Sequence, residues 1–148
     1  MLKRDSKGFT LIELLIVVAI IGIIAAIAIP NLLNAIDRGK QKRTMADMRS
    51  LGTAVESYAV DNNVYPAVSD ANALKTIVET GAYIKNMPTA DGWNNTFQVA
   101  STATQYTLYS FGKDNTGSDC TQGQTTLFTD QICFINGQFL RYPAGSQQ

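Results

Sequence analysis

The chain has 148 residues, of which 45% are apolar and only 16% charged, and its twelve basic and twelve acidic side chains give a formal net charge of zero. This length fits one domain plus an appendage. The balanced charge argues against bulk electrostatic binding to nucleic acid. The sequence contains no histidine, which excludes a histidine-based catalytic triad and a histidine-ligated metal.

A long apolar run follows a short basic start. Residues 1–8 are polar and net positive, and residues 14–29 contain no charged or strongly polar side chain. With residues 9–12 included, the run approaches the roughly 20 residues that a membrane-spanning helix needs. The leading basic residues favour a cytoplasmic start, so the rest of the chain would face the periplasm or the outside.

Glu13 lies inside this run and separates three interpretations of it. An ordinary secretory signal peptide is one, since Ala26-Ile27-Ala28 offers a small-x-small cleavage site. A plain signal anchor is the second. Both leave an expensive intramembrane carboxylate without a role. In the third interpretation the helix is retained as a building element in which Glu13 has a function.

The stretch KGFTLIELLIVVAIIGIIAAIAIP, residues 7–30, resembles the N-terminus of type IV pilins and of the pseudopilins of type II secretion. The matching features are the Gly8–Phe9 step, Glu13 four residues after Phe9, the unbroken apolar run and Pro30. The resemblance implies cleavage after Gly8 by a prepilin peptidase, N-methylation of Phe9 and assembly of the helix into the core of a helical homo-oligomeric filament.

The resemblance also implies a location and partners. The precursor would sit in the bacterial inner membrane, with lipid around its helix and its head in the periplasm. An inner-membrane assembly platform would polymerise it. The finished filament would be a surface pilus or, alternatively, a periplasmic pseudopilus.

Glu13 is expected to act on assembly register. Cleavage would create a cationic amine on Phe9, and Glu13 of one subunit could neutralise the amine of its neighbour in a low-dielectric core. Mismatched registers would leave a buried charge unpaired, which is strongly unfavourable. A pair within one subunit is the alternative before assembly. Pro30 should kink or locally melt the helix, because proline lacks an N–H and clashes with the preceding turn.

The helical pattern continues beyond the apolar run. Apolar side chains recur at three- and four-residue spacing, at Met45, Met48, Leu51, Val55 and Tyr58. A helix over residues 9–61 would be about 80 Å long, so its first half should pack on other subunits. The predicted organisation is a leader over 1–8, a transmembrane and filament-core helix over 9–30, an amphipathic continuation over 31–61 and a globular α+β head over 62–148.

Turn residues divide the head into shorter elements. Ser69 or Asp70 can cap a helix that runs to Thr80 and stops at Gly81. Strand patterns follow over 96–100, 105–111 and 132–142, and Asn136-Gly137 in the last predicts a type I′ hairpin. The predicted fold class is α+β, with a long N-terminal helix packed on a small antiparallel sheet of three to four strands.

The two cysteines, Cys120 and Cys133, predict one disulfide if the chain is exported, and two buried thiols if it stays in a reducing compartment. A disulfide-closed loop near the C-terminus is a feature in which the chain resembles type IV pilins rather than typical major pseudopilins. Conversely, Asp91-Gly92-Trp93-Asn94-Asn95 resembles a stretch of the major pseudopilins, although a turn with Trp93 as a core anchor is the favoured interpretation of it.

One loop could bind a metal. Oxygen donors that suit Ca²⁺ gather between Ser110 and Gly123, with one more across the loop. Major pseudopilins carry calcium in a similarly placed loop, although polar loops of this kind are usually plain turns. The candidate ligands are Asp114, Asn115, Ser118, Asp119 and Asp130.

No enzyme is predicted, because the sequence holds no histidine, nucleophile elbow or Walker loop. The basic cluster over residues 38–43 lies on the long helix and makes a poor DNA patch, so no nucleic acid partner is expected. The sequence therefore predicts a structural pilin that polymerises into a type IV pilus. The alternative is a major pseudopilin that forms a periplasmic pseudopilus for protein export.

Overall fold

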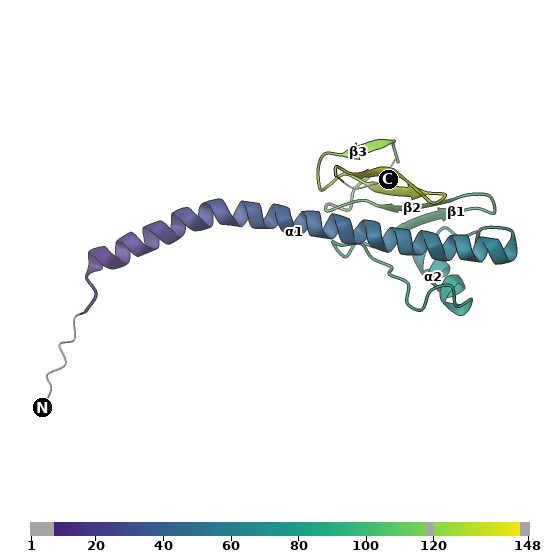
Figure 1. The fold of residues 1–148 in the computed structure, drawn as a ribbon, viewed down its shortest axis with the longest axis horizontal. Helices are drawn as coiled ribbons and strands as arrows, with labels where there is room; N and C mark the ends of the chain where they lie inside the picture. The colour runs from purple at the N-terminus through teal and green to yellow at the C-terminus, as the bar shows by residue number, and fades with distance from the viewer. Residues whose placement is uncertain (1–7, 118–119, 146–148) are drawn as a thin grey trace, which may run out of the picture. The chain divides into compact units, whose positions relative to one another are not determined.

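The computed structural model describes residues 8–117 and 120–145 (Figure 1). The chain divides into two compact units, Met1–Ile36 and Asp37–Gln148. Helix α1 spans Leu11–Asn62 and helix α2 spans Ala71–Thr80. Five strands follow: β1 (Gln98–Ser101), β2 (Tyr106–Ser110), β3 (Gly123–Thr125), β4 (Ile132–Ile135) and β5 (Gln138–Pro143). The predicted α+β class with a long N-terminal helix is confirmed.

The first unit holds the apolar part of α1. Its large apolar side chains are exposed, from 89% at Phe9 to 45% at Ile36. By length and composition α1 could cross a membrane. The helix passes through Pro30 without a break, and the local melting that the sequence allows is not seen. The Asn31 side chain donates to the carbonyl of Ile27 at 3.1 Å, in the turn that contains the proline.

In the second unit, α1 lays its apolar stripe against the sheet, which Figure 1 shows alongside this part of the helix. Met48, Leu51 and Val55 are fully buried, as their three- and four-residue spacing predicts. Gly52 lies on the same face. A Cβ there would overlap the Phe134 ring, so glycine allows the helix and the sheet to approach this closely.

Helix α2 begins and ends where the sequence indicates. Asp70 is the N-cap, and its carboxylate accepts hydrogen bonds from the backbone N–H groups of Asn72 and Ala73. At the other end, Gly81 is the C-cap and its N–H donates to the carbonyl of Ile77. Leu74 and Val78 pack into the same core as α1.

The sheet has five strands in the order β1-β2-β4-β5-β3, so the prediction of three to four strands was wrong. Neighbouring strands are antiparallel except for β3, which lies parallel to β5, with Gly123 opposite Arg141 and Thr125 opposite Pro143. Strand β3 has only three residues, too few to show an alternating pattern in the sequence. It lies at the edge of the sheet and depends on β5 for its hydrogen bonds.

The predicted hairpin between β4 and β5 is present. Its two turn residues, Asn136 and Gly137, have φ angles of 47° and 85°, the positive values that a type I′ turn needs. The Asn136 side chain also accepts a hydrogen bond from the backbone N–H of Tyr106 at 2.9 Å, which fixes the turn to strand β2.

Candidate functional site

Helix α1 begins with a capping box formed by Thr10 and Glu13. The Thr10 backbone N–H and hydroxyl both donate to Glu13 Oε2, at 2.8 and 2.7 Å, and the Glu13 N–H donates to the Thr10 hydroxyl at 3.3 Å. Each residue thereby satisfies a donor that has no partner inside the helix. The Thr-x-x-Glu spacing of a capping box is present in the sequence, where Glu13 is expected only to act in assembly.

The predicted processing step lies directly before this box. Gly8 and Phe9 precede the first helical residue, and both are exposed. Among the described residues, and apart from its chain neighbours, no atom lies within 4 Å of the place where a Gly8 Cβ would stand. An exposed segment outside a helix is a form that a peptidase can bind. Residues 1–7 of the predicted leader lie outside the described residues.

A polar cluster surrounds Asp37, the first buried residue of α1. The Trp93 indole N–H donates to Asp37 Oδ1 at 3.0 Å, and the Lys113 ammonium lies 2.8 Å from Asp37 Oδ2. One carboxylate thus ties α1 to two segments that are 56 and 76 residues further along the chain. No sequence pattern predicts this cluster, because a single acid on a helix usually faces solvent.

The loop that presents Trp93 is held by a second buried carboxylate. Asp91 is 3% exposed, and its Oδ1 accepts hydrogen bonds from the backbone N–H groups of Trp93 and Asn95, each at 2.9 Å. Its Oδ2 accepts one from the Ser110 hydroxyl at 2.6 Å. Trp93 itself is only half-buried. It is therefore a hydrogen-bonding contact to α1 and not the core anchor expected from the sequence.

Gly92 brings this loop against the backbone of α1. Its N–H donates to the Thr44 hydroxyl at 2.9 Å. A Cβ on Gly92 would lie 2.8 Å from Lys40 Cα and closer still to the Lys40 carbonyl oxygen. Only glycine allows an approach this close. Together, Asp91, Gly92 and Trp93 fix the loop to the turns of α1 that contain Asp37 and Thr44.

The Asp37 cluster makes stability depend on pH. The hydrogen bond from Lys113 holds the pKa of Asp37 below its ordinary value of 3.8, while burial acts in the opposite direction. When the pKa of a carboxyl is lower in the folded state, its charged form stabilises the fold at pH values above the pKa of the unfolded state. This stabilisation is lost as the pH falls through the pKa of the folded state. We expect acidification from about pH 6 to about pH 3 to lower the melting temperature more in the wild type than in Asp37→Asn.

Thermal unfolding of the full chain in detergent, at both pH values, measures this difference. Asp114 and Asp130 also have lowered pKa values. Both proteins therefore lose stability in acid, and the comparison with Asp37→Asn isolates the contribution of Asp37. An equal fall of the melting temperature in the two proteins would show that Asp37 does not contribute to the pH dependence.

The predicted disulfide between Cys120 and Cys133 is present. Cys133 is fully buried in strand β4, opposite Tyr109 of β2, and Cys120 is half-buried in the loop between β2 and β3. The bond therefore attaches a long loop to a central strand of the sheet.

Removing the disulfide should lower the free energy of unfolding by about 3 kcal/mol, since it closes a loop of about 14 residues. Chemical denaturation of the double variant Cys120→Ala/Cys133→Ala, compared with the wild type, measures the change. The wild type treated with a reductant serves as the control and should unfold at nearly the same denaturant concentration as the variant. A variant as stable as the oxidised wild type would contradict the expectation.

The candidate calcium ligands are largely engaged within their own loops. Asp114 accepts hydrogen bonds from Thr116, and Asp130 Oδ2 accepts them from the N–H groups of Thr126 and Leu127. Asp130 Oδ1 lies 3.6 Å from Arg141. In residues 8–117 and 120–145, no three acidic, histidine or cysteine side chains are grouped to hold a metal. The remaining candidates are Asn115, which is exposed, and Ser118 and Asp119, which lie outside the described residues.

Pilin-like filament subunits have this architecture, in which an exposed apolar helix follows a cleavage motif and continues into a small α+β unit. The prokaryotic N-terminal methylation motif matches residues 3–29. The profile of the type II secretion system (T2SS) protein G matches residues 31–126. The chain belongs to this family.

Individual relatives agree. The chain is 33% identical to the type II secretion system core protein G of Aeromonas hydrophila, over 86% of this chain and 97% of the relative. It is 34% identical to the core protein G of Pseudomonas aeruginosa, over 80% of this chain and 93% of the relative. It is also 38% identical to the type IV major fimbrial protein FimA of Dichelobacter nodosus, over 76% of each chain. No solved structure matches the chain significantly.

These matches reverse the order of the two functions expected from the sequence. The protein G profile covers the second half of α1 and most of the head, and not only the N-terminal segment that pilins and pseudopilins share. The pseudopilin, given above as the alternative, is therefore better supported than the pilus subunit. Both are structural subunits, which agrees with the expectation that the chain is not an enzyme.

Proposed function

We propose that this chain is a pseudopilin that polymerises into the periplasmic pseudopilus of a type II secretion system. The match of the protein G profile to residues 31–126 carries the proposal, because it rests on the head rather than on the shared N-terminal motif. The docked loop at Asp91, Gly92 and Trp93 supports it as well, since this stretch resembles the major pseudopilins.

Before assembly, the subunit is an inner-membrane precursor whose apolar helix lies in lipid and whose head lies in the periplasm. A prepilin peptidase removes residues 1–8 and exposes the Phe9 amine, which is then methylated. An assembly platform in the inner membrane moves the helix from lipid into the filament core.

The transfer into the filament needs more than apolar contact. Lipid tails are as apolar as the exposed leucines and isoleucines of α1, so the hydrophobic effect gains little when the helix leaves the bilayer. Close packing and charge pairing must therefore select the assembled state. Glu13 is the charged side chain of the described apolar segment between Phe9 and Ile36. We assign it the partner proposed from the sequence, the Phe9 amine of a neighbouring subunit.

Deleting the gene tests the proposal. A pseudopilin deletion should abolish the release of secreted enzymes into the medium and leave surface pili intact, and a plasmid copy should restore secretion. Enzyme activity in culture supernatants and electron microscopy of pili are the two measurements. Loss of pili with normal secretion would instead identify a pilus subunit, which is the function that the 38% identity to FimA and the disulfide favour.

The mass of the mature protein tests the processing steps. Residues 9–148 plus one methyl group and minus two hydrogens would establish cleavage after Gly8, methylation and the disulfide in one measurement. The mass of the full 148-residue chain would refute the cleavage.

A calcium titration of the melting temperature tests the proposed cation in the loop that contains Asp114, and an unchanged melting temperature would count against it.

A further inference from the structure

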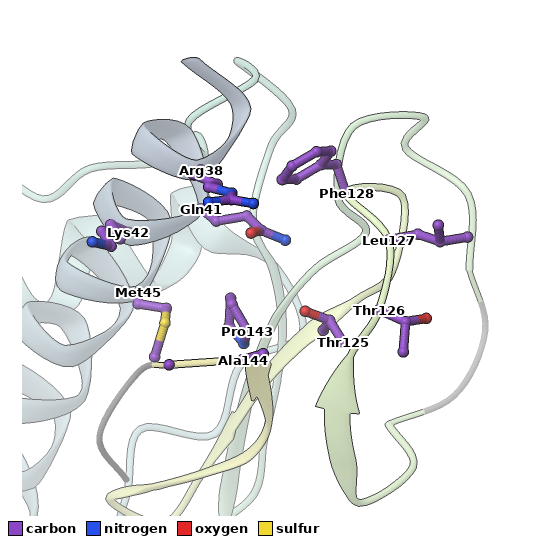
Figure 2. Close-up of a pocket in the computed structure, with 11 residues that line it drawn as sticks. Arg38, Gln41, Lys42, Met45, Thr125, Thr126, Leu127, Phe128, Pro143 and Ala144 are labelled. Atoms are coloured by element: carbon purple, nitrogen blue, oxygen red, sulfur yellow. The ribbon is translucent and has the colours of Figure 1, made fainter. Parts of the chain in front are cut away.

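One pocket of the second unit combines positive charge with an apolar wall. It has a volume of about 580 Å³ and lies between α1 and the segments at the ends of β3 and β5. Figure 2 shows Arg38 and Gln41 on the helix, Phe128 beside Arg38, and Met45 near Pro143. Lys42 lines the pocket and also a shallower neighbouring hollow.

The two cations of this pocket make no salt bridge within the described part of the chain. The acid–base pairs found there are Arg43–Asp47, Lys75–Glu79, Lys113–Asp37 and Arg141–Asp130. Asp130 follows the pocket residue Phe128 closely, but its carboxylate is held by Arg141 and by two backbone N–H groups. Arg38 and Lys42 are therefore available to bind an anion.

The other lining residues suit a ligand that is only partly polar. Met45 and Pro143 are buried and Phe128, beside Arg38, is half-buried, so the lining of the pocket has an apolar part as well as its polar side chains. A free inorganic anion would use the cations and leave this apolar part unused. A phospholipid presents a charged phosphodiester, a polar glycerol and the first carbons of its acyl chains, which match all parts of the lining.

The position of Arg38 in the sequence places such lipids within reach. Residues 9–36 would span about 42 Å as a helix, which is close to the thickness of a bilayer with its headgroups. Arg38 follows Ile36, the last residue of the apolar run, by two positions, so it belongs at the far headgroup layer. Arginine and lysine side chains at such a layer can pair with the phosphate groups of lipids.

We propose that the pocket lined by Arg38, Gln41, Lys42, Met45 and Phe128 binds the headgroup of an anionic phospholipid while the subunit is in the membrane. The lipid would hold the head at the bilayer surface until assembly withdraws the helix. This inference rests on the inner-membrane location proposed above, but it does not depend on whether the filament is a pilus or a pseudopilus.

Native mass spectrometry of the full chain in detergent micelles tests it. The probes are phosphatidylglycerol and phosphatidylcholine with identical acyl chains, with glycerol phosphate as the lipid-free anion. Phosphatidylglycerol should bind at least about fivefold more tightly than phosphatidylcholine, and Arg38→Gln/Lys42→Gln should weaken its binding about tenfold. The matched control, Lys40→Gln/Arg43→Gln, removes two charges from the same turns outside the pocket and should change binding less than about twofold.

Several results would overturn the proposal. Equal binding of the two lipids would exclude headgroup recognition, and equal losses in both double variants would show general charge attraction. Competition by glycerol phosphate at lipid-like concentrations would identify a free-phosphate site. Unchanged lipid binding with reduced self-association of Arg38→Gln/Lys42→Gln would show that the pocket receives a neighbouring subunit.

A second measurement does not depend on variants. Photo-crosslinking phosphatidylglycerol should label peptides that contain residues 38–45 and 125–128 of the wild-type chain, and labelling elsewhere would count against the pocket. If lipid did not bind but deletion of the gene abolished secretion as expected, this inference would be rejected and the proposed function would stand.

Discussion

Asp91→Ala is expected to lower the free energy of unfolding by about 4 kcal/mol. The substitution removes a buried carboxylate that accepts hydrogen bonds from the backbone of Trp93 and Asn95 and from the Ser110 hydroxyl. Three donors lose their acceptor, of which the Ser110 hydroxyl is buried and the two backbone N–H groups are part-buried. The loop that carries Gly92 and Trp93 would then separate from α1.

Chemical denaturation of the full chain in detergent measures the loss. Asp114→Ala is the matched control, because it removes an equally sized carboxylate that accepts exposed hydrogen bonds from the nearby Thr116. Its cost should stay below about 1 kcal/mol. Asp91→Asn keeps one acceptor oxygen and should fall between the two. A cost for Asp91→Ala as small as that of Asp114→Ala would show that the cluster does not hold the loop.

Glu13→Gln is expected to reduce filament assembly at least about tenfold while leaving the start of α1 intact. A glutamine side chain can still accept the hydrogen bond from Thr10, so the capping box survives. What disappears is the negative charge that would pair with the Phe9 amine of a neighbour. Filaments sheared from cells that overproduce the protein, compared by immunoblot at equal membrane levels, give the measurement.

Thr10→Ala separates the two roles of Glu13. This change removes the other half of the capping box, which costs about 1 kcal/mol of helix stability, and leaves the Glu13 charge in place. Assembly should therefore decline only slightly in Thr10→Ala. If Thr10→Ala lost its filaments and Glu13→Gln kept them, Glu13 would serve to cap the helix and not to pair charges.

Much of the head could be predicted from local sequence because the controlling residues are neighbours. Asp70 and Gly81 bound α2, and Asn136 and Gly137 form the hairpin, since caps and tight turns depend on the conformations of one to three residues. The buried stripe on α1 was likewise visible from its spacing.

Interactions between distant segments could not be predicted. Asp37 binds Trp93 and Lys113, and neither partner is marked in the sequence as a neighbour of a helical acid. Strand β3 was missed for the same reason, because its pairing with β5 and not its own composition makes it a strand. Glu13 is the contrasting case. Its capping partner Thr10 is only three residues away in the sequence, whereas the resemblance to pilins implies a partner on a neighbouring subunit.

The two outer strands of the sheet have a consequence for a protein that works at high local density. At one margin β3 offers only three residues, and at the other Ser101 exchanges backbone hydrogen bonds of 3.1 and 2.8 Å with Val68. Little unpaired backbone remains at either margin to template an intermolecular β-ribbon. Neither margin of the sheet therefore presents a long unpaired strand to a neighbouring copy of the head.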